Sequence, residues 1–89
     1  MRSPQSRLAG YNKKGKIWLN SKIPKEHRKR VRTHERTEFK WRMKGYSYKQ
    51  AHKKGLKAEH KGMTRKQIAR YEGTLGAIAR WYPVRRTKR

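Results

Sequence analysis

Acidic and imidazole side chains gather in one stretch of this chain, HERTEFKWRMKGYSYKQAHKKGLKAEH, which covers residues 34–60. The protein has 28 Lys and Arg and only five Glu, yet three of the five Glu and three of the four His lie here. On a helix, His34 and Glu38 share a face, and so do His52 and Glu59. Two antiparallel helices would bring these four side chains together, and imidazoles with carboxylates can hold zinc or another divalent metal.

An enzyme is one function that this set of residues allows. Glu35 directly follows His34, the position of the general base in helical zinc hydrolases, although the motif here is H-E-x-x-E and not H-E-x-x-H. The alternative function is therefore a metal-dependent hydrolase or nuclease, with Glu35 as catalytic base and a metal on His34, Glu38, His52 and Glu59.

The same stretch resembles a helical segment of small phage-encoded proteins, in which His-Glu-x-x-Glu is followed by Tyr-x-x-Ala-His and then by a Glu. The resemblance covers about a third of the chain and implies metal binding without implying a particular activity. It rests on His34, Glu35, Glu38, Tyr48, Ala51, His52 and Glu59.

We favour a simpler interpretation, with no catalytic residue and no metal. Glutamates among many arginines relieve repulsion and form ion pairs between helices, while histidines of a basic protein contact bases or phosphates. The surrounding positive field also disfavours the binding of a metal cation.

The element that carries His34 is predicted to be a helix over residues 24–44. Pro24 suits the first helical position, and Gly45 suits the position just past the end. Residues 39–44 alternate between apolar and basic, which is a strand pattern. Glu26 with Arg30, however, has the favourable order for a helix, so we predict a helix.

Two further helices are predicted from capping boxes. Ser47 with Gln50 opens a helix over residues 48–60, and Thr64 with Gln67 opens another that Pro83 closes. The last helix has the clearest amphipathic stripe of the chain: Ile68, Tyr71, Leu75, Ile78 and Tyr82.

Gly73 and Gly76 weaken that third helix, so either a close helix contact compensates for them or the helix breaks there. A break would make residues 63–82 a helix-turn-helix, a weaker match than one continuous helix because the residues next to Gly73 are Glu72 and Thr74.

These elements predict a small all-α protein of two or three helices with extended basic arms at both ends. We expect a basic arm over residues 1–23, a helical domain over 24–82 and a basic tail over 83–89. Within the arm, Ile17–Leu19 is either a short strand or an anchor that docks on the body. We favour the anchor, because no convincing partner strand follows.

The charge indicates a polyanionic partner. A net charge of +23 on 89 residues is hard to sustain in a compact monomer, and basic chains release counterions when they bind phosphates. No apolar run is long enough for membrane insertion, and the chain has no Cys for disulfides or Cys-based zinc sites. We expect an intracellular protein of the cytoplasm or nucleoid, or a virion protein, and not a secreted one.

The predicted function is nucleic-acid binding with little sequence specificity. Structured RNA in a larger ribonucleoprotein assembly, such as a ribosome, is expected first and compacted DNA next; an inhibitor that docks on an acidic protein partner is a further alternative. The predicted contact residues are basic blocks with two aromatics: Lys13, Lys14, Lys16, Trp18, Arg28, Lys29, Arg30, Arg32, Tyr46, Lys53, Lys54, Lys57, Arg85, Arg86, Lys88 and Arg89.

Overall fold

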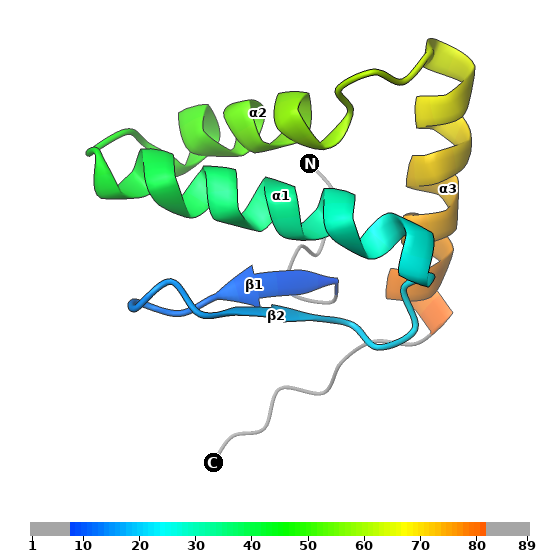
Figure 1. The fold of residues 1–89 in the computed structure, drawn as a ribbon, viewed down its shortest axis with the longest axis horizontal. Helices are drawn as coiled ribbons and strands as arrows, with labels where there is room; N and C mark the ends of the chain where they lie inside the picture. Colours follow the sequence, from blue (N-terminus) through cyan, green and yellow to red (C-terminus); the bar gives the residue numbers. More distant parts are fainter. Residues whose placement is uncertain (1–7, 82–89) are drawn as a thin grey trace.

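The computed structural model describes residues 8–81, which form three helices and a small N-terminal β-hairpin. In chain order the elements are β1 (Ala9–Tyr11), β2 (Ile17–Leu19), α1 (Lys25–Met43), α2 (Tyr48–Glu59) and α3 (Arg65–Trp81). Helices α1 and α2 lie side by side, α3 stands across one end of this pair, and the hairpin runs along α1 (Figure 1). The predicted all-α character is confirmed, because the three helices make up most of the described residues and the only strands among them are the two short ones of the hairpin.

The helix ends follow the predicted signals, except that Pro24 is the N-cap residue before Lys25 and not the first helical residue. The Ser47 hydroxyl accepts a hydrogen bond from the Gln50 backbone N–H at 3.2 Å, and the Gln50 side chain accepts one from the Ser47 N–H, so the capping box is complete. Gly45 and Gly62 have φ of +97° and +82°, the left-handed conformation that lets the chain leave one helix and enter the next. The strand alternative for residues 39–44 is wrong, because α1 is helical to Met43.

The hairpin corrects the expectation for the N-terminal segment. Strand Ile17–Leu19 pairs antiparallel with Ala9–Tyr11, with Gly10 opposite Trp18, so the segment is a short strand whose partner precedes it instead of following it. Leu19 also packs against the hydrophobic core, as an anchor on the body would. The Asn12 side chain closes the turn by accepting hydrogen bonds from the backbone N–H groups of Lys14 and Lys16 at 2.8 and 2.9 Å.

The hydrophobic core lies between α3, the start of α1 and the hairpin. It consists of Leu8, Ala9, Ile23, Val31, Tyr71, Leu75, Ile78 and Ala79. Three members of the predicted α3 stripe are therefore buried, Ile68 is half-buried, and Tyr82 lies outside the described residues. Helix α2 contributes no residue to this cluster.

Helix α3 runs without a break past both of its glycines. The continuous-helix prediction is confirmed and the helix-turn-helix alternative is wrong. Within the described part of the chain, no atom lies within 4 Å of a Cβ built on Gly73 or Gly76, so the expected close contact is not found. None of the helices in residues 8–81 is both long and apolar enough to cross a membrane.

Candidate functional site

The predicted convergence of His34, Glu38, His52 and Glu59 occurs, at the buried contact of α1 with α2. The His34 side chain is fully buried, with Nδ1 2.8 Å from Glu59 Oε1 and Nε2 3.1 Å from Glu38 Oε1. Burial lowers the pKa of His34, but the hydrogen bonds to the two carboxylates outweigh it and raise the pKa from 6.5 to about 9. At neutral pH, His34 is therefore an imidazolium that donates to both carboxylates.

The cluster extends to all three helices. The Tyr71 hydroxyl, from α3, donates to Glu59 Oε2 at 2.6 Å. His52 Nδ1, from α2, lies 3.8 Å from Glu38 Oε1, and the His52 ring stacks on Tyr48 with centroids 5.4 Å apart. We did not predict Tyr71 as a member, because its place on the apolar stripe of α3 accounts for its burial. Its hydroxyl was the available signal, since a buried tyrosine needs a polar partner.

Gly55 allows α2 to approach α1 closely at this point. A Cβ built on Gly55 would lie 3.0 Å from the His34 carbonyl oxygen and 3.2 Å from a carbon of its ring. Gly55 is thus the residue that lets Glu59 of α2 reach His34 of α1.

The hairpin covers the other side of the acidic residues. Burial, then the nearby charges of Glu38 and Glu35, raise the pKa of Tyr11 to about 12, so its phenol stays neutral. The Tyr11 ring packs edge-on against Phe39, with ring centroids 5.5 Å apart. Glu35, the candidate catalytic base, is only 1% exposed and lies near Tyr11 beneath the hairpin.

A metal at this cluster would have to displace existing bonds. Ligand atoms of His34, Glu38 and His52 lie within 4.8 Å of one another, as metal ligands would. However, both ring nitrogens of His34 already face carboxylates, and His34, Glu38 and His52 are 0%, 1% and 8% exposed. The geometry favours an internal ion pair over a hydrolytic centre that a substrate has to reach.

This burial also corrects part of the simpler interpretation. His34 and His52 lie inside the protein, so they do not contact bases or phosphates. Glu38 and Glu59 do form ion pairs, and the His34–Glu59 pair links α1 to α2, but the partner is an imidazolium where we expected arginine.

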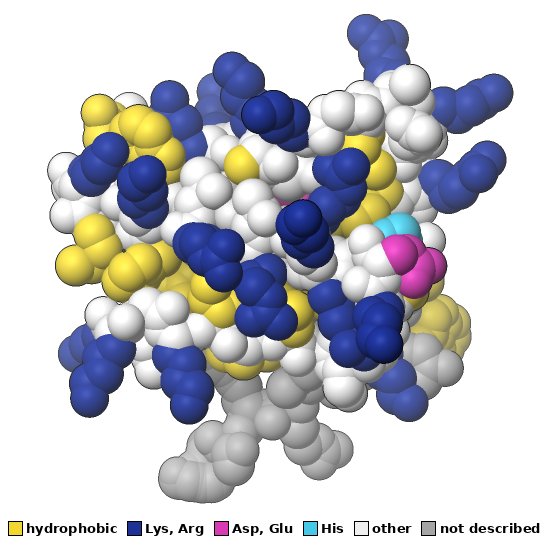
Figure 2. All heavy atoms as spheres, in the orientation of Figure 1, with side chains coloured by type: hydrophobic (Ala, Val, Ile, Leu, Met, Phe, Trp, Pro, Cys, Tyr) yellow, Lys and Arg dark blue, Asp and Glu magenta, His cyan; other side chains and the backbone are white. Residues whose placement is uncertain are grey.

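Because most of the glutamates are buried, the charged side chains on the outer surface are almost all cationic. Three of the five Glu are buried, at 0–1% exposure, whereas every Lys and Arg in residues 8–81 is exposed or half-buried. Only Glu26 and Glu72 among the glutamates reach the surface. Figure 2 shows Lys and Arg distributed across the visible face, with acidic side chains visible mainly near its right edge.

The predicted contact residues fall into separate groups. Lys13, Lys14 and Lys16 are exposed at the hairpin turn, and Lys29 and Arg32 are exposed on α1. Trp18 is half-buried and lies over Gly10, where a Cβ would come within 2.6 Å of the indole nitrogen. The predicted residues Arg85, Arg86, Lys88 and Arg89 lie outside the described part of the chain.

Arg28 and Arg30 have structural partners. Arg28 Nε donates to the Ile23 carbonyl at 2.9 Å. One Arg30 nitrogen donates to the carbonyl oxygens of Glu59 and Lys61 at 2.8 and 2.9 Å, which ties α1 to the end of α2.

The turn between α1 and α2 carries exposed aromatic and apolar side chains among lysines. We call Trp41, Met43, Tyr46 and Tyr48 the aromatic tip; Met43 is 67% exposed and both tyrosines are 40% exposed. The ammonium groups of Lys44 and Lys54 each lie 4.6 Å from the Trp41 ring centre.

Beside this tip, Tyr46, Gln50, Lys53, Lys54 and Lys57 line a hollow of about 330 Å³. The structure thus brings one predicted aromatic and three predicted lysines to one place. Figure 2 shows the apolar side chains of this end of the molecule next to Lys and Arg.

Comparison of the chain with protein-family models, with curated proteins and with solved structures found no match.

Proposed function

We propose that this protein binds nucleic acid through its cationic surface, with little sequence specificity. Structured RNA, within a ribonucleoprotein assembly, is the first target and compacted DNA the second. The observation that carries the proposal is the sorting of charge: the carboxylates of Glu35, Glu38 and Glu59 are buried while the cations face outward.

This sorting has a physical cost that a polyanion relieves. With a net charge of +23, cations repel one another across the surface, and three of the five carboxylates that could offset them externally are buried. Phosphates along a nucleic acid supply closely spaced negative charge, and their condensed counterions are released on binding. Binding is therefore driven by many weak phosphate contacts and not by one charged pair.

The distribution of cations favours folded RNA over a single groove of DNA. Basic residues project from the hairpin turn, from all three helices and from the aromatic tip, which suits contacts to phosphates on several sides. The aromatic tip adds rings that can stack on unpaired bases, which loops and bulges of RNA present.

The salt dependence of binding tests the proposal. Affinity for a structured RNA should fall steeply with salt, with a log–log slope that counts the phosphates engaged. A Lys53→Gln/Lys54→Gln/Lys57→Gln variant should have a slope smaller by up to about three. A slope near zero in the wild-type protein, or no binding at low salt, would refute the proposal.

The same assay separates nucleic acid from an acidic protein partner. Polyglutamate of matched charge should compete less well than RNA, because it lacks phosphates and bases for the aromatic tip to stack on. Equal competition would instead favour the inhibitor alternative, in which only the density of negative charge matters.

A further inference from the structure

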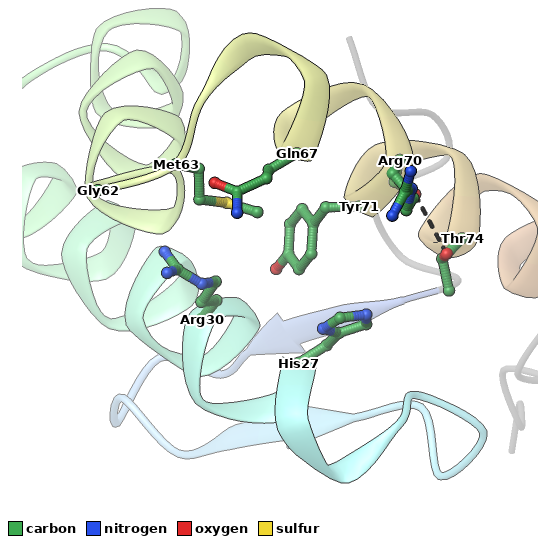
Figure 3. A pocket seen from close by; sticks show the side chains of 8 residues that line it. All are labelled: His27, Arg30, Gly62, Met63, Gln67, Arg70, Tyr71 and Thr74. Atoms are coloured by element: carbon green, nitrogen blue, oxygen red, sulfur yellow. Dashed lines mark hydrogen bonds between the residues drawn. The ribbon is translucent and has the colours of Figure 1, made fainter.

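A pocket lies between the first half of α1 and the start of α3 (Figure 3), at the end of the helix pair opposite the α1–α2 turn (Figure 1). Its volume of about 340 Å³ lies near the lower limit for small-molecule sites, which is roughly 300 Å³. Its lining includes His27, Arg30, Met63, Gln67, Arg70 and Tyr71.

The walls of this pocket are held in place by bonds to the rest of the fold. Arg30 donates to the carbonyl oxygens of Glu59 and Lys61, and the Tyr71 hydroxyl donates to the Glu59 carboxylate at 2.6 Å. The rings of His27 and Tyr71 meet edge to face, with centroids 5.0 Å apart. A ligand would therefore enter a pocket that is already formed, which reduces the entropy lost on binding.

The chemistry of the lining suits a ligand that is anionic at one end and apolar at the other. Two guanidinium groups, those of Arg30 and Arg70, lie on the two helices that form the walls, and none of the lining residues carries a carboxylate. Guanidinium groups match phosphate oxygens in geometry and charge. Met63 and the edge of the Tyr71 ring supply the apolar wall (Figure 3).

We propose that this pocket takes one unpaired nucleotide of the bound nucleic acid, with its phosphate toward Arg70 and its base against Met63. The inference rests on the proposed nucleic-acid binding and adds a defined position to it. The protein then distinguishes an RNA that can extrude a nucleotide from one that is fully paired, without distinguishing one base sequence from another.

Two RNA hairpins that differ only by one bulged nucleotide test the inference. The wild-type protein should bind the bulged hairpin about tenfold more tightly, since a hydrogen bond between charged groups is worth roughly that factor. Arg70→Gln should remove this preference. Lys66→Gln, an exposed cation on the same helix but outside the pocket, should weaken both complexes equally and keep it.

Methionine methyl groups report where the unpaired base lies. Of the three Met, Met63 lines the pocket and Met43 is at the aromatic tip, so ¹³C-methyl labelling places one probe at each candidate position. The bulged hairpin should shift the Met63 methyl resonance beyond the change caused by the paired hairpin.

The outcomes separate this inference from the proposed function. Equal affinity for the two hairpins, or a preference that Arg70→Gln retains and Tyr46→Ser loses together with a shift of Met43 alone, overturns the pocket but leaves nucleic-acid binding in place. Failure to bind either hairpin at low salt overturns both.

Discussion

Protonation of His34 should make the stability of this protein fall as the pH rises from about 6 to about 9. The pKa of His34 is raised from 6.5 to about 9 in the folded protein, because Glu38 and Glu59 accept hydrogen bonds from both ring nitrogens. A group with a raised folded-state pKa contributes its full stabilisation below its unfolded pKa of about 6.5 and loses it as the pH rises through the folded value.

The size of the effect follows from the two pKa values. The difference between 6.5 and about 9 corresponds to roughly 3 kcal/mol of unfolding free energy. For a domain of this size, that loss should lower the melting temperature by on the order of 15 °C. Urea unfolding at a series of pH values, at constant ionic strength, measures the free energy directly.

A His34→Gln variant isolates the contribution of this one side chain. Glutamine can still hydrogen-bond but carries no charge, so the difference in stability between wild type and variant should shrink from pH 6 to pH 9. Lysines that lose charge at high pH affect both proteins and cancel in the difference. A wild-type-minus-variant difference that is flat over this range would refute the imidazolium assignment.

Four further results are expected from the same structure. Gly73→Ala and Gly76→Ala should each raise the unfolding free energy by roughly 0.5–1 kcal/mol, because among the described residues nothing crowds the added methyl group, and chemical denaturation measures the gain. Gly55→Val should lower the unfolding free energy by roughly 1–3 kcal/mol, as overpacking does, since a Cβ at this position would lie 3.0 Å from the His34 carbonyl oxygen. Unchanged stability would show that α2 is not close-packed against α1 there. Tyr46→Ser should weaken binding of single-stranded RNA by roughly 1 kcal/mol while duplex binding stays the same, as a fluorescence titration would show. Zinc at pH 7 should leave the melting temperature unchanged, and a rise that His34→Ala abolishes would instead establish the metal site.

The helices could be predicted from sequence because their ends are encoded locally. Ser47 with Gln50 and Thr64 with Gln67 form the expected caps, and Gly45 and Gly62 occupy the turns. The hairpin could not be predicted from sequence, because each strand is only three residues long. In addition, β1 comes before the apolar run of β2, whereas a partner strand was sought after it.

Helical spacing correctly predicted that His34, Glu38, His52 and Glu59 converge, but it did not predict which hydrogen bonds and ion pairs they form. That depended on Gly55, which sets the distance between the helices, and on Tyr71, which arrives from a third helix. Neither the close approach of two backbones nor the direction of a hydroxyl is visible in residue spacing alone.

Helix α2 buries Ala51 but contributes no residue to the main hydrophobic cluster, which has a consequence for how precisely that helix is placed. Apolar contacts carry no requirement for charge pairing, so on their own they discriminate between alternative registers less sharply than paired buried charges do. Helix α2 instead meets α1 through directional bonds such as that from His34 to Glu59, and a slip of one turn would leave buried charges without counterions. The internal ion pair thus acts as a register lock, and it fixes where the lysines of α2 stand relative to those of α1.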